Sequence, residues 1–397
     1  MAADAGSGPI VVLGAGYAGL GLVQAIDRLA RGRAPLVLVD RHPLHVLRTE
    51  LYEVGRLARE GGDARSFSVP LADVLDRTSV RFRQGELRSI DLAGRTVALD
   101  TGTLDFGSLA ICVGNVAAYY GVPGAAEHTH QVYRLSGAQR LAAALREVER
   151  RSSALPGEAR PRVVVIGGGS TGTELASEIA TTDWSRIVGA SARPPDVFLL
   201  TGALPFLAGL PPAVIARAAE TLRRVGVTVV RGYNVTRVEP QRISMADGSS
   251  LACDLAVWCA GLEAPPVVGA LAVPHGRAGR LAVAPTLEVP AWPGIFAIGD
   301  VVELRDPVTG ALVPSTAQAA RAEARVAAKN ILARRADRPL VPFRYRERGL
   351  IVALGRGRAA GAVQHVTIWG SPAAVLKRIV EREYAGRVGR GEPPRLV

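Results

Sequence analysis

The sequence predicts an α/β protein with two Rossmann-like, three-layer dinucleotide-binding domains, the second inserted in the first, and a short C-terminal segment. Two observations support this prediction. Glycine-rich turns begin at Gly14 and at Gly167, and each lies between a short apolar run and an apolar stripe at helical spacing. The pattern after each turn is repeated as well, and it closes at Gly114 in the first copy and at Gly261 in the second. Two copies of one nucleotide-binding unit predict two nucleotide sites.

The first turn stands in the full context of a dinucleotide fingerprint. The run from Ile10 to Leu13 is expected to be a buried parallel strand, and the predicted turn contacts after it are Gly14, Gly16, Tyr17, Ala18 and Gly19. Gly14 permits a tight turn, Gly16 lets the backbone approach a pyrophosphate, and Gly19 lets the helix pack closely on the strand. The next strand ends in Asp40, which can accept hydrogen bonds from a ribose. A purely structural glycine turn is the alternative.

The second copy repeats the turn but lacks the acidic residue. The run 162–166 is followed by a turn whose predicted contacts are Gly167, Gly169, Thr171 and Gly172. The strand that corresponds to the one ending at Asp40 ends here at Thr201. A carboxylate at this place would select the free 2′-hydroxyl of NAD, and a nearby arginine would accommodate the 2′-phosphate of NADP. Because the segment after Thr201 is neutral, we expect either a relaxed choice that tolerates NADPH or a contact from another loop.

Two further elements carry candidate site residues. An apolar run ends in Gly299-Asp300, and the carboxyl ends of strands face the cofactor crevice in such sheets. Asp300 can bond a sugar or ribityl hydroxyl there, or it can merely cap a turn. Residues 314–333 then predict a helix that Ser315 or Thr316 can cap. The N-terminus of this helix can stabilise negative charge on a reduced flavin ring.

Composition and charge narrow the function classes. The chain has 397 residues, a formal net charge of +12 and 48% hydrophobic residues, enough for full cores. Its arginines are scattered among few aromatic residues, so we predict no nucleic-acid partner. The cysteines, Cys112, Cys253 and Cys259, lie in apolar runs without a paired motif, which favours buried reduced thiols over disulfides, metal ligands or redox cysteines. We also predict no signal peptide and no transmembrane helix, and hence a cytoplasmic location. No metal site is predicted.

Five stretches together resemble one protein family. They are Val11 to Gly19, Thr49 to Val54, Val163 to Glu178, Phe296 to Asp300, and Pro314 to Gln318. In these stretches the chain resembles the FAD-dependent pyridine nucleotide oxidoreductases and, among them, type II NADH dehydrogenase, the single-subunit NADH:quinone oxidoreductase. The similarity extends to about residue 360.

The resemblance implies a division of the chain and a role for each part. Residues 1–118 and 286–342 would form an FAD-binding domain, residues 119–285 an NAD(P)H-binding domain, and residues 343–397 a C-terminal segment. The implied FAD contacts are Gly14, Gly16, Tyr17, Ala18, Gly19, Asp40, Arg41, Thr49, Gly114, Gly299, Asp300, Ala317 and Gln318. The implied NAD(P)H contacts are Gly167, Gly169, Thr171, Gly172, Glu174, Thr201 and Gly261. The candidate catalytic residues are Glu174, at the nicotinamide–flavin junction, and Gln318, beside the pyrimidine end of the flavin.

The implied activity is hydride transfer from NADH to FAD, with NADPH as an alternative donor, followed by reduction of a quinone. The chain departs from the family at two positions of this scheme. It has Ala322 where the quinone-site helix usually has a second glutamine, and Thr201 where an acidic residue is usual. Two alternatives therefore stay open. One is a soluble NAD(P)H:acceptor oxidoreductase with a ferredoxin-like or small-molecule acceptor, and the other is a flavin-bearing scaffold with slow turnover.

The C-terminal segment contains an amphipathic pattern at residues 371–388. The pattern places Leu376, Ile379, Val380 and Tyr384 on one helix face, and Lys377, Arg378 and Arg382 on the other. A basic amphipathic helix can lie on an anionic membrane surface. Its apolar stripe can equally pack on the protein or on a second subunit in a homodimer. The sequence thus predicts either peripheral attachment to the inner face of the cell membrane or a protein contact.

Overall fold

The first parallel sheet is assembled from both ends of the chain. The computed structural model describes residues 8–152, 159–202, 204–364 and 366–392. The strands, in sheet order, are β20 (Ile295–Ala297), β9 (Ser108–Ile111), β1 (Ile10–Leu13), β2 (Leu36–Asp40) and β5 (Arg81–Gln84). All neighbouring pairs are parallel, and the central strands β9 and β1 are buried on both faces, which explains their continuous apolar runs.

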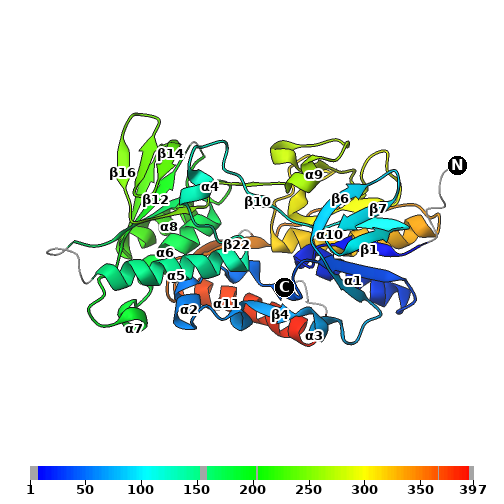
Figure 1. Cartoon of the computed structure of the whole chain (residues 1–397), viewed down its shortest axis with the longest axis horizontal. Helices are drawn as coiled ribbons and strands as arrows, with labels where there is room; N and C mark the ends of the chain where they lie inside the picture. Colours follow the sequence, from blue (N-terminus) through cyan, green and yellow to red (C-terminus); the bar gives the residue numbers. More distant parts are fainter. Residues whose placement is uncertain (1–7, 153–158, 203, 365, 393–397) are drawn as a thin grey trace.

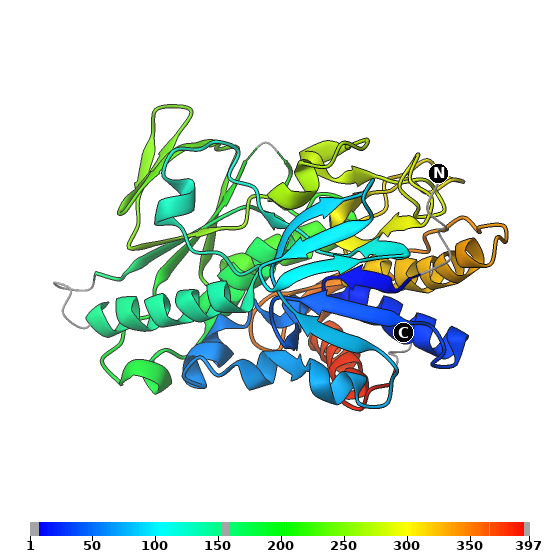
Figure 2. The same cartoon turned by 45° about the vertical axis from the view of Figure 1, so that its right-hand side comes forward.

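Helices and an antiparallel sheet close the core of this half (Figures 1 and 2). Helices α1 (Tyr17–Ala30) and α10 (Ala317–Arg335) lie side by side, with Gly21 against Ala324. The antiparallel strands are β6 (Leu87–Asp91), β7 (Thr96–Leu99) and β8 (Gly102–Asp105). Their buried side chains join the same apolar cluster as β1 and β9.

The second sheet repeats this plan. Its parallel strands, in order, are β13 (Val227–Arg231), β12 (Asp196–Thr201), β11 (Arg162–Ile166) and β17 (Leu255–Trp258). Alternate residues of β11 enter different cores. Val163 and Val165 pack with helices α5 (Leu135–Ser152), α6 (Ser170–Thr181) and α8 (Pro212–Arg224), whereas Val164 and Ile166 pack with an antiparallel ribbon. The ribbon strands are β14 (Val235–Glu239), β15 (Arg242–Met245) and β16 (Ser250–Ala252).

The connection between the halves explains the insertion. The chain leaves the first half through β10 (Val116–Ala117) and returns through β18 (Leu262–Glu263), and these two strands pair antiparallel. Strand β20 follows this return and completes the first sheet beside β9. In Figure 1 both crossing segments run between the two halves. The predicted fold class, two Rossmann-like units with the second inserted in the first, is therefore confirmed.

The C-terminal segment contains more structure than the sequence predicted. Strands β22 (Gly349–Ala353), β23 (Ala359–Val363) and β24 (Val366–Gly370) form an antiparallel sheet before helix α11 (Ser371–Gly389). Buried Val352 and Ala360 join the core of the second half. Helix α11 runs under the molecule and reaches β4 (Ser68–Pro70) and α3 (Leu71–Leu75) of the first half (Figure 1). The segment therefore contacts both halves.

The predicted faces of α11 are partly wrong. Tyr384 is buried as expected, together with Ala373 and Val388. Ile379, however, is 56% exposed, and the side chain of Lys377 is only 14% exposed. The inward face carries charges because acidic side chains of the first and second halves meet it there. None of the helices in the described ranges is both long enough and apolar enough to span a bilayer.

The remaining helices and short strands connect these layers. They are β3 (Leu44–Val46), α2 (Val54–Arg59), α4 (Ala125–His128), α7 (Ser185–Val188), α9 (Pro266–Gly269), β19 (Leu281–Ala282) and β21 (Val302–Glu303).

Candidate active site

The two glycine turns have the same geometry. Gly14 and Gly167, the first glycines, adopt φ of +99° and +123°, which side chains rarely tolerate. A Cβ on the third glycine would collide with the carbonyl oxygen of the first in both copies. The middle glycines, Gly16 and Gly169, have no atom within 4 Å of where a Cβ would stand, and neither helix N-terminus has a side-chain cap. These open turns fit the pyrophosphate of a dinucleotide.

Asp40 organises the first turn. The Ala15 N–H donates to its Oδ2 at 2.8 Å, and the His42 N–H donates to its Oδ1 at 2.9 Å. Each carboxylate oxygen keeps a further lone pair for a ribose hydroxyl. The neighbouring Arg41 instead lies 3.7 Å from Glu86, on the surface. The structure thus places Asp40, rather than Arg41, at the turn itself.

A polar cluster joins Asp300 to the first turn's neighbourhood. The Asn115 Nδ2 donates to Asp300 Oδ2 at 2.9 Å, and Arg48 Nη2 donates to Asn115 Oδ1 at 2.7 Å. Gly114 adopts φ of +70°, and a Cβ added there would lie 3.1 Å from Arg48 Nη1. Asp300 therefore does more than cap a turn. Arg48 and Asn115 were not predicted, although each is adjacent in sequence to a predicted residue, Thr49 or Gly114.

Helix α10 presents its N-terminus and an unpaired donor. Thr316 is the cap, since its Oγ1 accepts from the Ala319 N–H at 3.2 Å. Within the described ranges, the buried Gln318 Nε2 has no hydrogen-bond partner. An orphaned donor beside a helix N-terminus fits a cofactor that brings acceptors and negative charge.

Glu323, two turns further, accepts from the Gly299 N–H at 2.6 Å, and burial raises its pKa to about 7. Glu323 was not predicted.

Glu174 is buried at the junction of the second half and the C-terminal segment. Its Oε1 accepts from the Ala353 N–H at 3.0 Å and lies 3.1 Å from Lys377 Nζ. Burial raises the pKa of Glu174, and Lys377 opposes this. Although burial also disfavours the ammonium, Glu174 and Glu381 raise the pKa of Lys377 above its ordinary value. Glu174 is thus a paired, buried carboxylate rather than a surface residue of α6.

More carboxylates surround this pair. Glu50, from the first half, lies 3.0 Å from Arg56 Nη2. Burial raises the pKa of Glu50 and of Glu178 to about 7 each, and nearby Glu381 contributes at Glu50. Lys377 Nζ also lies 5.2 Å from the centroid of the Tyr52 ring. The junction can therefore hold and exchange protons near neutral pH.

His45 connects α11 to the first glycine turn. The imidazole is fully buried, and burial lowers its pKa. A neutral ring has one donor and one acceptor. Because Nδ1 lies 2.8 Å from the Ala15 carbonyl oxygen, it carries the proton, and Nε2 accepts from the Tyr384 hydroxyl at 2.9 Å. The Tyr17 ring packs 4.8 Å from Tyr384, and its hydroxyl lies 2.8 Å from Thr49 Oγ1. His45 is structural.

The residues of the second site lie at the carboxyl ends of β11, β12 and β17. Thr171 is the second residue of helix α6, whose N-cap is Gly169. Gly261 lies against the hydroxyl of Tyr120, a residue that sequence reasoning missed. Thr201 is buried, with its methyl group against Gly168.

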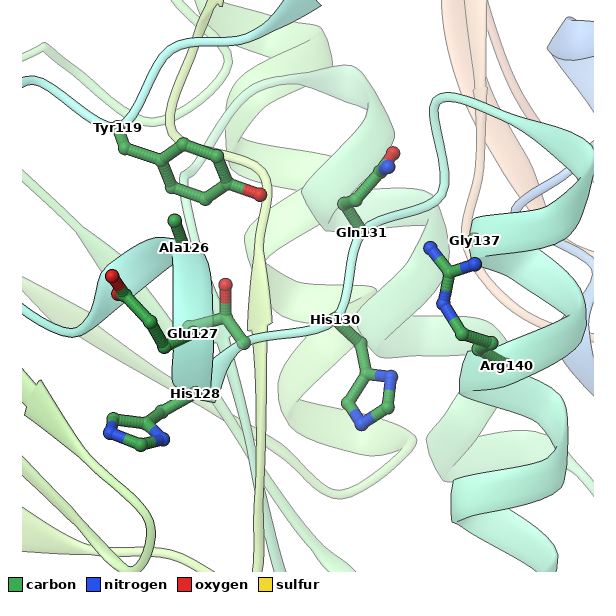
Figure 3. Close-up of a pocket in the computed structure, with 9 residues that line it drawn as sticks. Tyr119, Ala126, Glu127, His128, His130, Gln131, Gly137 and Arg140 are labelled. Carbon is green, nitrogen blue, oxygen red and sulfur yellow. The ribbon is translucent and has the colours of Figure 1, made fainter.

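A cavity of about 400 Å³, lined by the residues drawn in Figure 3, includes no residue of either glycine turn. It is formed at the outer edge of the second sheet, where His130 pairs with Val257 of β17. Polar side chains including Glu127, His130 and Arg140 line it. None of the predicted site residues contributes to its wall.

Comparison with known proteins agrees with this geometry. The family model described as pyridine nucleotide-disulphide oxidoreductase matches residues 8–324. The chain belongs to this oxidoreductase family. It is 31% identical over 390 residues to NADH dehydrogenase-like protein Rv1812c of Mycobacterium tuberculosis, covering 94% of this chain and 92% of that protein. It is 29% identical over 382 residues to demethylphylloquinone reductase NdbB of Synechocystis sp., covering 94% and 90%.

The structure of NDH2 from Plasmodium falciparum in complex with NADH has the same fold as this oxidoreductase. The TM-score is 0.83 with 14% identity, over 96% of each chain. Relatives named type II NADH:quinone oxidoreductase also match most of the chain. The resemblance to type II NADH dehydrogenase is therefore confirmed.

This oxidoreductase has no redox-active disulfide among its cysteines. Cys112, Cys253 and Cys259 are free and buried, as predicted. Burial raises the pKa of Cys259 to about 12 and that of Cys253 to about 11. Cys112 and Cys259 hold equivalent places, since each packs against the third glycine of its turn. Thiols in such positions are inert and fill space.

Proposed function

We propose that the protein is an FAD-dependent dehydrogenase that takes hydride from NAD(P)H and passes electrons to a quinone. One observation carries the proposal. The C-terminal helix holds both halves at one acidic junction, because its Lys377 pairs with Glu174 of the second copy and its Tyr384 bonds His45 of the first. Two dinucleotide sites joined in this way suit hydride transfer between two cofactors. The names of the relatives, which include NADH dehydrogenase-like protein and demethylphylloquinone reductase, support it.

The first copy would hold FAD and the second the nicotinamide nucleotide. We propose residues 1–118 and 286–342 as the FAD domain, residues 119–285 as the NAD(P)H domain, and residues 343–397 as the C-terminal segment. Gly16 and the N-terminus of α1 would bind the pyrophosphate, Asp40 the ribose, and Asp300 the ribityl chain. Ala317 and Gln318 would meet the pyrimidine end of the ring. Bound FAD supplies hydride acceptance and stepwise release of electrons.

The chain itself would orient the nicotinamide and supply protons. Reduction of a quinone to a quinol consumes two protons. Glu50 can hold one of them, since Arg56 occupies Oε2 and leaves Oε1 for a proton at neutral pH. Glu174, fixed by Lys377, would orient the nicotinamide at the junction. Substituting Glu174→Gln is expected to slow flavin reduction more than it weakens nucleotide binding.

The outer face of α11 supports peripheral membrane contact. Val375 and Ile379, one helical turn apart, are each 56% exposed, and Arg378 and Arg382 flank them. Apolar side chains with adjacent cations suit an anionic lipid surface. Sedimentation with anionic and neutral liposomes tests this contact. A concentration-dependent mass that saturates at twice the monomer would instead assign the same face to a homodimer.

Anaerobic mixing of the FAD-loaded protein with NADH or NADPH, followed by a soluble quinone, tests the proposed activity. Rapid bleaching of the flavin bands and fast recovery on quinone are expected. Bleaching without recovery on quinone would retain the dehydrogenase and assign the electrons to a ferredoxin-like or small-molecule acceptor. No bleaching by either nucleotide would overturn the enzyme and favour a flavin-bearing scaffold.

A further inference from the structure

The two copies differ in charge at the end of their second strands. In the first copy, Asp40 ends β2 and pairs in register with Gln84 of β5. In the second copy, Thr201 ends β12 and pairs in register with Arg231 of β13. The acidic Asp40 of the first copy thus corresponds to the neutral Thr201, and the neutral Gln84 corresponds to the cationic Arg231. Because strand order and register correspond, both pairs stand where the adenosine ribose of a dinucleotide is bound.

The surroundings hold Arg231 at this edge without neutralising it. Its guanidinium carbon lies 5.8 Å from the centroid of the Phe206 ring. The Leu207 N–H donates to the Gly168 carbonyl at 2.9 Å, which fixes Phe206 beside the glycine turn. In the parts of the chain that the structure describes, no acidic side chain forms an ion pair with the exposed Arg231.

The loop after Arg231 closes around Thr201. The N–H groups of Gly232 and Tyr233 both donate to the Thr201 carbonyl oxygen, at 2.9 and 3.2 Å. Residues 201–212 contain no aspartate or glutamate. Nothing acidic in this segment could therefore select a free 2′-hydroxyl or repel a phosphate.

We propose that Arg231 binds the 2′-phosphate of NADPH and makes NADPH the preferred nucleotide of the second site. A planar guanidinium can donate two parallel hydrogen bonds to a phosphate, and the Phe206 ring limits its motion. Thr201 would leave room for the phosphate that a carboxylate would exclude. The inference rests on the proposed function for the hydride step, but the binding site itself does not require turnover.

Calorimetry on the FAD-loaded protein separates binding from activity. The probes are adenosine 2′,5′-bisphosphate and AMP, which differ in the 2′-phosphate alone. We expect the bisphosphate to bind at least about tenfold more tightly, and Arg231→Gln to weaken it by about ten- to hundredfold while AMP changes little. Added salt should weaken the bisphosphate more than AMP. Equal affinities of the two probes, or equal losses in Arg231→Gln, would overturn the proposal.

The matched control is Arg237→Gln. Arg237 is an exposed arginine of the same half, on β14 of the antiparallel ribbon, away from the strand end. Its replacement should leave both affinities unchanged, and melting curves show whether either variant perturbs the fold. A loss of discrimination in Arg237→Gln as large as in Arg231→Gln would assign the effect to general surface charge and reject the specific site.

Flavin reduction then distinguishes this inference from the proposed function. NADPH should reduce the flavin at lower concentration than NADH, and Arg231→Gln should reverse the order. Reduction by NADH with no advantage for NADPH would reject Arg231 as the determinant and keep the dehydrogenase. Tight binding of the bisphosphate without reduction by either nucleotide would keep the site and reject the dehydrogenase.

Discussion

The two glycine turns are nearly identical in backbone, yet their surroundings differ. In the first, the residue after the leading glycine, Ala15, is bonded on both sides by side chains: its N–H by Asp40 and its carbonyl by His45. In the second, the carbonyl of the corresponding Gly168 accepts a main-chain N–H, from Leu207. A turn fixed by side chains from other segments suits a cofactor that stays bound. A turn held through a main-chain hydrogen bond from Leu207 suits a nucleotide that leaves after each cycle.

The largest effect should come from filling the third glycine of either turn. A side chain at Gly19 or Gly172 must collide with the carbonyl of the first glycine, so Gly19→Val and Gly172→Val should each destabilise their half by about 3 kcal/mol. We expect Gly19→Val to be purified without FAD and Gly172→Val to keep FAD but resist reduction. Denaturant unfolding and flavin absorbance measure both. Gly269→Ala, at an open position, is the control; retention of FAD in Gly19→Val would contradict the assignment of the copies.

The second-largest effect should come from breaking the ion pair between Lys377 of α11 and Glu174 of α6. Lys377→Met leaves Glu174 and Glu381 without their cation in a poorly solvated place, and we expect a loss of about 2 kcal/mol in the free energy of unfolding. The double variant Lys377→Met, Glu174→Gln should recover part of the loss. Arg378→Met, on the exposed face of the same helix, is the control. A double variant no more stable than Lys377→Met alone would argue against the pairing.

A smaller effect is expected where α11 touches the first copy. Tyr384→Phe removes only a hydroxyl and leaves the buried His45 Nε2 without its donor, which should cost about 1.5 kcal/mol and loosen FAD by about tenfold. Fluorescence of released FAD measures this affinity. Reduction by NAD(P)H at saturating FAD should be nearly unchanged. If Tyr384→Phe weakened nucleotide binding at the second turn and left the affinity for FAD unchanged, the assignment of FAD to the first turn would be contradicted.

The smallest effect is expected in the pH dependence of the free energy of unfolding. Folded Glu50, with a pKa of about 7 against an ordinary 4.5, holds a proton that the unfolded chain has released. Its contribution to stability is full below pH 4.5 and is lost as the pH rises through about 7. Glu50→Gln should therefore flatten the stability profile between these values, by on the order of 1 kcal/mol. Glu60→Gln, at the exposed end of α2, should not. An unchanged slope in Glu50→Gln would place the titration elsewhere.

Local patterns predicted the turns, and long-range contacts account for what they missed. The glycines and Asp40 follow from spacing along a single strand–turn–helix unit. Arg48 and Asn115 gain their meaning only because Asp300, far along the chain, closes onto them. A sequence cannot show which distant carboxylate a polar residue will meet.

The C-terminal segment was the least predictable part for two physical reasons. Strand β23 is built from small residues, Ala359-Ala360-Gly361-Ala362, which carry little strand signal. The inner face of helix α11 was predicted only in part, because apolar periodicity assumes that charges point to water. Lys377 points inward, and Glu174 compensates its burial across the chain.

The position of α11 also has a consequence for biosynthesis. This helix is translated after both copies, so the ribosome releases two complete glycine turns before Lys377 and Tyr384 can reach them. A nascent chain that stops before α11 would contain every glycine of both fingerprints, but it would lack the contacts of α11 with Glu174 and His45. Residues 371–389 must therefore be synthesised before Lys377 can pair with Glu174 and Tyr384 can bond His45.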